Sequence, residues 1–143
     1  MKTAVTRLVL AVALISGVAA AASAQEVVRR IDEPTPLDAN DPLAVRSASL
    51  LKHILAGDKV AAVALLRKEA DEEYAKGGTL ETDVEAQVKR LSAGNYKIRE
   101  FDKGFGADVV VHLANDKGED AYVVIRYNGE KKMTGFAEAR IQR

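Results

Sequence analysis

The spacing of apolar residues changes near residue 95, and this change limits the chain to a fold in which helices precede strands. Before that point, apolar residues recur at every third or fourth position, as in amphipathic helices. After it, segments rich in β-branched and aromatic residues are separated by turns that contain Gly or Asn. Helices followed by an antiparallel sheet form an α+β domain, with the helices covering one face of the sheet.

Three helices are predicted between residues 42 and 93. The start signals are, in order, Asp41 followed by Pro42, then Asp58, then a capping box of Thr82 and Glu85; the predicted ends are Gly57, Gly77 and Gly94. The second helix is expected to be continuous and to place its apolar residues on one side: Val60, Val63, Leu66, Ala70 and Tyr74.

Four strands are predicted at residues 96–102, 108–113, 121–127 and 132–141, forming an antiparallel meander. Pairing the middle two across the turn at residues 115–119 places Val109 opposite Ile125 and Val111 opposite Val123. We expect the three helices to cover this aliphatic face. The other face would carry Val110 opposite Val124, His112 opposite Tyr122, and Asp108 near Arg126.

Residues 1–24 have the pattern of an export signal: Lys2 and Arg7, an apolar stretch at residues 8–18, and a small-residue ending at Ala22-Ser23-Ala24. The alternative is an uncleaved membrane anchor, but the apolar stretch is shorter than the ~20 residues that span a bilayer. We therefore predict a periplasmic or secreted protein with no membrane association after the signal is removed.

All three prolines lie between residues 34 and 42. Proline restricts its own backbone and that of the preceding residue, so residues 25–41 are interpreted as a stiff, Pro-rich lead-in to a single α+β domain at residues 42–143. The alternative is a docking peptide of the polyproline type, but the segment has no PxxP repeat.

Charge and composition exclude several classes of function. The chain has 21 basic and 21 acidic residues; without Lys2 and Arg7 the mature form would carry a net charge of −2. Basic and acidic residues are interspersed, so no basic face for nucleic acid is expected. With no Cys and two distant His residues, we expect no disulfide, thiol nucleophile, metal site or cofactor.

Three segments carry a resemblance to a known family: Leu55-Ala-Gly-Asp58, Leu91-x-x-Gly94 and Asn128-Gly-Glu-Lys-Lys-Met-Thr-Gly-Phe136. From residue 48 to 141 the chain resembles the nuclear transport factor 2-like (ketosteroid-isomerase-like or SnoaL-like) superfamily, in its short secreted bacterial form. The resemblance implies a cone-shaped cavity between helices and sheet, and dimers formed through the sheet. It does not imply an activity.

Enzymes of this family place an ionisable base and a donor inside the cone, and no such set maps onto this chain. The positions expected to face the helices are all aliphatic: Val109, Val111, Leu113, Val123 and Ile125. We therefore predict no catalytic residue. A sheet register shifted by one residue would reverse the two faces and bring His112, Tyr122 and Arg126 inside.

His112, Tyr122 and Arg126 are the candidate ligand-binding residues, because an imidazole, a phenol and a guanidinium could bind a polar or anionic group. The alternative is a mixed outer face on which Arg126 pairs with Asp108 and His112 packs beside Tyr122. Val110 and Val124 are the candidate interface of a homodimer, because apolar groups on an uncovered sheet face often mark a contact surface.

Two hypotheses about function follow from these patterns. The first is an exported, non-catalytic small domain that binds a small apolar ligand or a protein partner. The second is a small isomerase- or dehydratase-type enzyme of the same fold, which needs a buried ionisable group with a shifted pKa inside a cavity.

The mature N-terminus is predicted at Gln25, because a small-residue pattern immediately precedes it. Intact-mass measurement of the protein recovered from periplasm or medium tests this prediction. A recovered species that still carries Met1 would contradict the export hypothesis.

Overall fold

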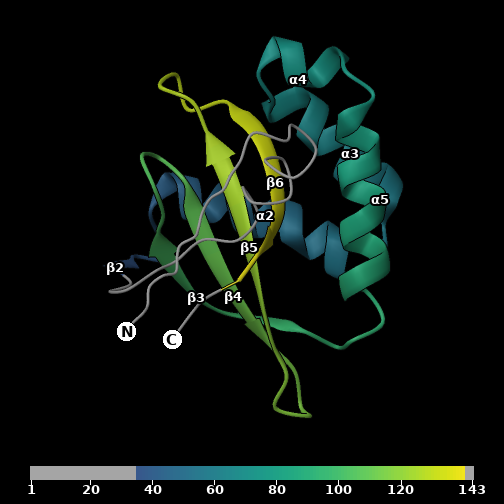
Figure 1. Ribbon diagram of the computed structural model, residues 1–143, viewed down its shortest axis with the longest axis vertical. Helices are drawn as coiled ribbons and strands as arrows, with labels where there is room; N and C mark the ends of the chain where they lie inside the picture. Colours follow the sequence, from purple (N-terminus) through teal and green to yellow (C-terminus); the bar gives the residue numbers. More distant parts are fainter. Residues whose placement is uncertain (1–34, 141–143) are drawn as a thin grey trace, which may run out of the picture.

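The computed structural model describes residues 35–140 as four helices and a five-stranded antiparallel sheet, which confirms the α+β class (Figure 1). In chain order the elements are β2 (Thr35–Leu37), α2 (Pro42–Leu55), α3 (Lys59–Glu69), α4 (Glu72–Lys76), α5 (Thr79–Leu91), β3 (Lys97–Lys103), β4 (Val109–Ala114), β5 (Asp120–Tyr127) and β6 (Met133–Ala139). The predicted export signal and the first part of the predicted lead-in lie outside the described residues.

The sheet has the strand order β2-β3-β4-β5-β6, so strands adjacent in the sequence are adjacent in the sheet. The predicted register of β4 and β5 is confirmed: Val109 pairs with Ile125, Val111 with Val123, and His112 with Tyr122. This register keeps the aliphatic row of both strands on one face, because side chains alternate along a strand.

The prediction of four strands was wrong by one, because β2 forms within the segment expected to be a lead-in. Leu37 pairs with Phe101 and Thr35 with Lys103, so β2 extends the sheet beyond β3 and precedes the helices. Pro36 is tolerated there because β2 is an edge strand, where the missing N–H need not remove a hydrogen bond between strands.

The prediction of three helices was also wrong, because the second predicted helix is split at Ala70. Ala70 has extended backbone (φ −81°, ψ 155°) and forms a parallel bridge with Met133 of β6. Asp71 then caps α4, accepting a hydrogen bond from the Glu73 N–H (3.1 Å). The expected apolar side of one long helix is therefore not continuous, and Val60 at its start is 81% exposed.

The third helix begins one turn earlier than its predicted capping box. α5 starts at Thr79, so Thr82 lies inside the helix and its hydroxyl donates to the Gly78 carbonyl (3.3 Å). Glu85 instead forms an ion pair with Lys59 of α3 (2.7 Å). The Thr-x-x-Glu pattern therefore does not cap this helix: Thr82 bonds the first turn of its own helix, and Glu85 contacts α3.

The helices cover the aliphatic face of the sheet. α2 contacts β3 and β4, α5 contacts β6, and α3 packs on α2 and α5 (Figure 1). The core contains Leu50, Leu51, Ile54, Leu66, Leu80, Val84 and Leu91 from the helices and Val109, Val111, Leu113, Val123 and Ile125 from the sheet. Each fully buried aliphatic side chain of this size contributes about 1.5–3 kcal/mol relative to exposure, so this layer is the main source of stability.

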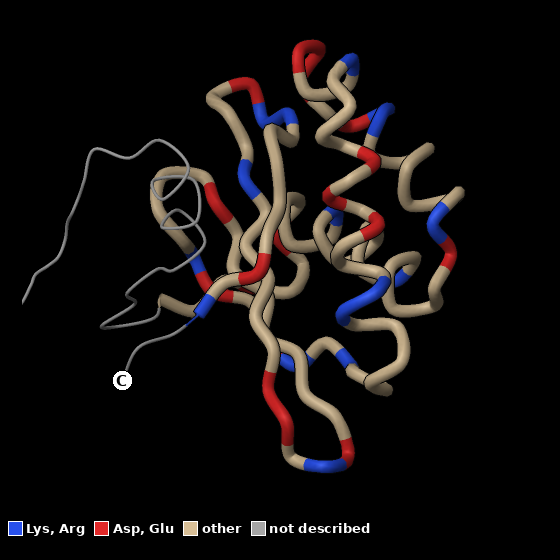
Figure 2. The backbone as a smooth tube through the Cα atoms, turned by 45° about the vertical axis from the view of Figure 1, so that its right-hand side comes forward, with Lys and Arg blue, Asp and Glu red and all other residues tan. Residues whose placement is uncertain are grey.

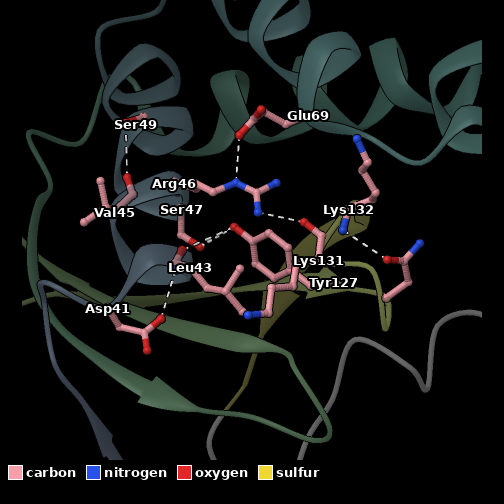
Figure 3. A network of polar contacts seen from close by, with 11 residues as sticks. Asp41, Leu43, Val45, Arg46, Ser47, Ser49, Glu69, Tyr127, Lys131 and Lys132 are labelled. Carbon is pink, nitrogen blue, oxygen red and sulfur yellow. Dashed lines mark hydrogen bonds and ion pairs between the residues drawn. The ribbon is translucent and has the colours of Figure 1, made fainter.

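Buried polar contacts anchor the start of α2 to the end of β5 (Figure 3). The Tyr127 hydroxyl lies 2.9 Å from the Ser47 hydroxyl and also donates to the Leu43 carbonyl (3.3 Å). Arg46 lies over the Tyr127 ring, with 5.2 Å between guanidinium carbon and ring centroid, and pairs with Glu69 (2.7 Å). Burial raises the pKa of Tyr127, partly opposed by the Ser47 hydrogen bond, so its hydroxyl remains a protonated donor.

Leu91 is predicted to be essential to the core, and its side chain is 1% exposed at the end of α5. Leu91→Ala should lower the free energy of unfolding by about 2–5 kcal/mol, through lost burial and the cavity that remains. Lys89→Ala, at an exposed position two residues earlier, should change it by less than about 0.5 kcal/mol. Urea unfolding of both variants tests the helix phasing, which similar midpoints would contradict.

Candidate functional site

His112 and Tyr122 lie together on the outer face of the sheet, as the register predicted. Their rings stack with centroids 4.7 Å apart and planes 12° apart. The His112 Nε2 is 2.8 Å from Asp120 Oδ1, and Nδ1 is 3.8 Å from Glu100 Oε1. Carboxylates thus lie on both sides of the imidazole and hold it in place, which fits the alternative of a mixed outer face.

Arg126 does not join His112 and Tyr122. Its Nε lies 3.5 Å from Asp108 Oδ2, the pairing expected for a mixed outer face. The Val110–Val124 pair lies between Arg126 and the Tyr122–His112 pair in the register. The three candidate ligand-binding residues are therefore divided between two places on the sheet.

Val110 and Val124 are buried rather than open on the surface, with exposed fractions of 0% and 2%. They form a second small apolar cluster with Ala139, and Tyr122 packs against it. The turn between β3 and β4 also lies close, since a Cβ added at Gly104 would come within 3.3 Å of Val110 Cγ2. The expectation of an exposed patch at these valines is thus wrong, while the homodimer itself stays a prediction.

A groove of about 560 Å³ lies at the β6 edge of the described fold, beside the corner formed by α4 and α5. Its sheet side is lined by Val124, Arg126, Thr134, Gly135, Phe136 and Ala137. Its helix side is lined by Asp71, Glu73, Tyr74, Gly77, Thr79 and Asp83. Apolar side chains and hydrogen-bonding groups thus face the same space, which is the usual composition of a ligand site.

Tyr74 and Asp83 form the central polar pair of this groove. The Tyr74 hydroxyl donates to Asp83 Oδ2 (2.5 Å), which joins α4 to α5. Burial raises the pKa of the Asp83 carboxyl, and the hydrogen bond from Tyr74 opposes part of this rise. Burial, then the hydrogen bond to Asp83 and its charge, raises the pKa of Tyr74, so the phenol stays protonated. The pair offers a ligand both a carboxyl oxygen and a phenol.

The face of the sheet under the helices offers no comparable site. The five residues predicted to lie there, Val109, Val111, Leu113, Val123 and Ile125, are at most 1% exposed. The row continues to Tyr127, whose hydroxyl is engaged by Ser47 and by the Leu43 carbonyl. The register shift that would have moved His112, Tyr122 and Arg126 under the helices does not occur.

Among residues 35–140, no group of three or more His, Cys, Asp or Glu side chains is arranged to hold a metal ion. In the same range, no helix has the length and apolar character needed to cross a bilayer. Figure 2 shows acidic and basic residues interspersed along the described chain rather than separated onto different faces.

No protein-family model, curated protein or solved structure matches this chain. The resemblance to the nuclear transport factor 2-like superfamily therefore stays a prediction, and the site must be interpreted from its own geometry.

Tyr74, Asp83 and Gly135 line the groove but are not predicted as site residues by the sequence. The expected place of Tyr74 on the apolar side of its helix is confirmed, because Tyr74 packs against the main core. The break at Ala70 starts a new helix there, and in α4 the same side chain also lines the groove. One signal was available, because Asp71 followed by Glu72 and Glu73 is a typical N-cap with an acidic first turn. No local pattern indicates that Gly135 faces open space.

Asp83 is expected to make stability depend on pH. Folding raises the pKa of the Asp83 carboxyl above its unfolded value of ~3.9. The free energy of unfolding of the wild type therefore falls as the pH rises above about 4, because the folded state disfavours the ionised carboxyl. Asp83→Asn keeps an acceptor for Tyr74 but cannot ionise. The difference between the free energies of unfolding of the variant and the wild type should therefore shift in favour of the variant between about pH 4 and pH 7.

Urea unfolding at the two pH values measures this difference. Asp116→Asn, at an exposed turn position, is the matched control. An Asp83→Asn effect of equal size at both pH values would contradict the expected titration.

Proposed function

We propose that this protein is an exported, non-catalytic binding module that takes a small apolar ligand or a segment of a protein partner in the groove beside β6. The observation that carries the proposal is the contrast between the two possible sites. The space under the helices is filled by aliphatic side chains, whereas the groove is open and combines apolar and hydrogen-bonding groups.

The groove residues favour binding over catalysis. Tyr74 and Asp83 satisfy each other, and Asp71 is engaged as the N-cap of α4. Arg126 is held by Asp108 at 3.5 Å. Groups held in this way are rigid recognition elements, because their positions are fixed before a ligand arrives.

The family resemblance remains part of this proposal. Support comes from the order of the main elements: helices α2 to α5 precede a long antiparallel meander and pack on one of its faces. The same superfamily includes binding modules as well as enzymes, so membership is compatible with a non-catalytic role.

The alternative, an isomerase- or dehydratase-type enzyme, is favoured by one observation. Tyr74 and Asp83 both have raised pKa values and line the groove, as an acid–base pair would. The two hypotheses differ in what Asp83→Asn does. A binding module keeps most of its affinity in this variant, whereas an enzyme that uses Asp83 as a base loses turnover while still binding substrate.

Filling the groove should abolish ligand binding without unfolding the protein. A Cβ added at Gly135 meets no atom within 4 Å, so Gly135→Phe should place a ring in the groove with little strain. Gly129→Phe introduces the same side chain at another open position, in the turn after β5, and is the matched control.

Indole is a suitable probe, because it is apolar and carries one N–H donor for a carboxyl oxygen. Titration of indole followed by amide NMR should shift signals of Gly135, Phe136 and Ala137 in wild type and in Gly129→Phe, and should not shift them in Gly135→Phe. Indole shifts located away from the groove, or equal in both variants, would contradict the proposed site.

A further inference from the structure

We infer that the edge of β6 is a docking site for an extended, basic segment of a partner protein, which adds to the sheet as a further strand. This inference rests on the proposed function, because it assigns the chemistry of the partner that the groove accepts. Strand addition of this kind obtains affinity from main-chain hydrogen bonds and specificity from the side chains beside the edge.

The chain itself shows that this edge accepts a backbone. Ala70 forms a parallel bridge with Met133, and the Asp71 N–H donates to the Met133 carbonyl (2.8 Å). After this contact the chain turns away into α4, and the groove continues along Thr134, Gly135, Phe136 and Ala137. The link between α3 and α4 pairs with the edge at Met133, so a partner strand would occupy the edge beyond this residue.

The shape of the edge suits an incoming strand. The pairing with β5 is regular from Gly135 to Ala139, and the bulge lies before it, between Arg126 and Tyr127. Gly135 presents no side chain, and the space beyond its Cα is open. A regular edge with little side-chain obstruction allows close approach of a second backbone.

The two edges of the described sheet differ in this respect. β2 is three residues long and contains Pro36, which lacks a donor and protects an edge against further pairing. β6 is seven residues long and contains neither Pro nor Lys, the residues that most often block edge pairing. Strand addition is therefore directed to β6.

Charge selects a basic partner. The helix side of the groove carries Asp71, Glu73 and Asp83, and Asp71 and Glu73 belong to the acidic segment at the start of α4 (Figure 2). On the sheet side, Arg126 is paired with Asp108. A lysine- or arginine-bearing strand would be attracted to this rim, whereas a second copy paired through β6 would bring two acidic rims together.

The test uses a short fluorescent peptide of alternating lysine and valine and the full mature protein. Fluorescence anisotropy measures affinity, and amide NMR locates the contact. Two matched peptides serve as controls: one with glutamate in place of lysine, and one with N-methyl groups on alternate backbone nitrogens. Sedimentation of the protein alone reports any pairing between copies.

We expect the lysine peptide to shift the amides from Thr134 to Ala137. The N-methylated peptide should bind at least about tenfold more weakly, because it loses main-chain donors. The glutamate peptide should bind more weakly still.

The protein variants test the same contact. Gly135→Phe should abolish binding of the lysine peptide, and Gly129→Phe should retain it. Glu73→Gln should lower the affinity for the lysine peptide about two- to threefold at low salt, and added salt should reduce this difference.

Equal affinity for the N-methylated peptide would overturn strand addition, since charge alone would then account for binding. If the glutamate peptide binds more strongly than the lysine peptide, the inference of a basic partner is wrong. The inference is also wrong if the protein alone forms dimers that the Gly135→Phe substitution separates. If no peptide binds but indole still shifts the groove amides, strand addition fails and the proposed binding function stands. If neither peptide nor indole reaches the groove, both fail.

Discussion

Burial of the aliphatic face of β4 and β5 under the helices is the constraint on which the rest of the structure depends. Val109, Val111, Val123 and Ile125 are almost fully buried, and their counterparts on α2 and α5 are equally inaccessible. Without disulfides, this layer must supply most of the stability of the fold. Its tight filling leaves no room for a ligand between the helices and the sheet, so the proposed site lies outside this space, at the β6 edge.

The break at Ala70 converts this packing into a candidate site. The sequence pattern predicts a single long helix here, but Ala70 adopts extended backbone and pairs with Met133 instead. The short α4 then turns toward α5, where the hydrogen bond between Tyr74 and Asp83 holds the corner. The same bridge therefore ends α3, positions the acidic residues of the groove, and gives the β6 edge one main-chain contact that a partner strand would extend.

The candidate site was largely beyond prediction from sequence, and the reason is physical. The sequence predicts that His112, Tyr122 and Arg126 share one face of the sheet, and the register confirms this placement. Sharing a face does not bring side chains together, however, and Arg126 pairs with Asp108 while His112 lies between Asp120 and Glu100. Tyr74 and Asp83 lie on different helices, so their proximity depends on the angle between α4 and α5, which no local pattern specifies.

The sequence by itself determined the α+β class, the register of β4 with β5, and the burial of Leu91, because each depends on periodicity within one or two segments. Only the tertiary structure decided that Thr35–Leu37 joins the sheet, that the helix after Asp58 stops at Glu69, and that Val110 and Val124 are buried. These features depend on contacts between residues far apart in the chain. Local propensity is a weak prior at such positions, and long-range pairing overrides it.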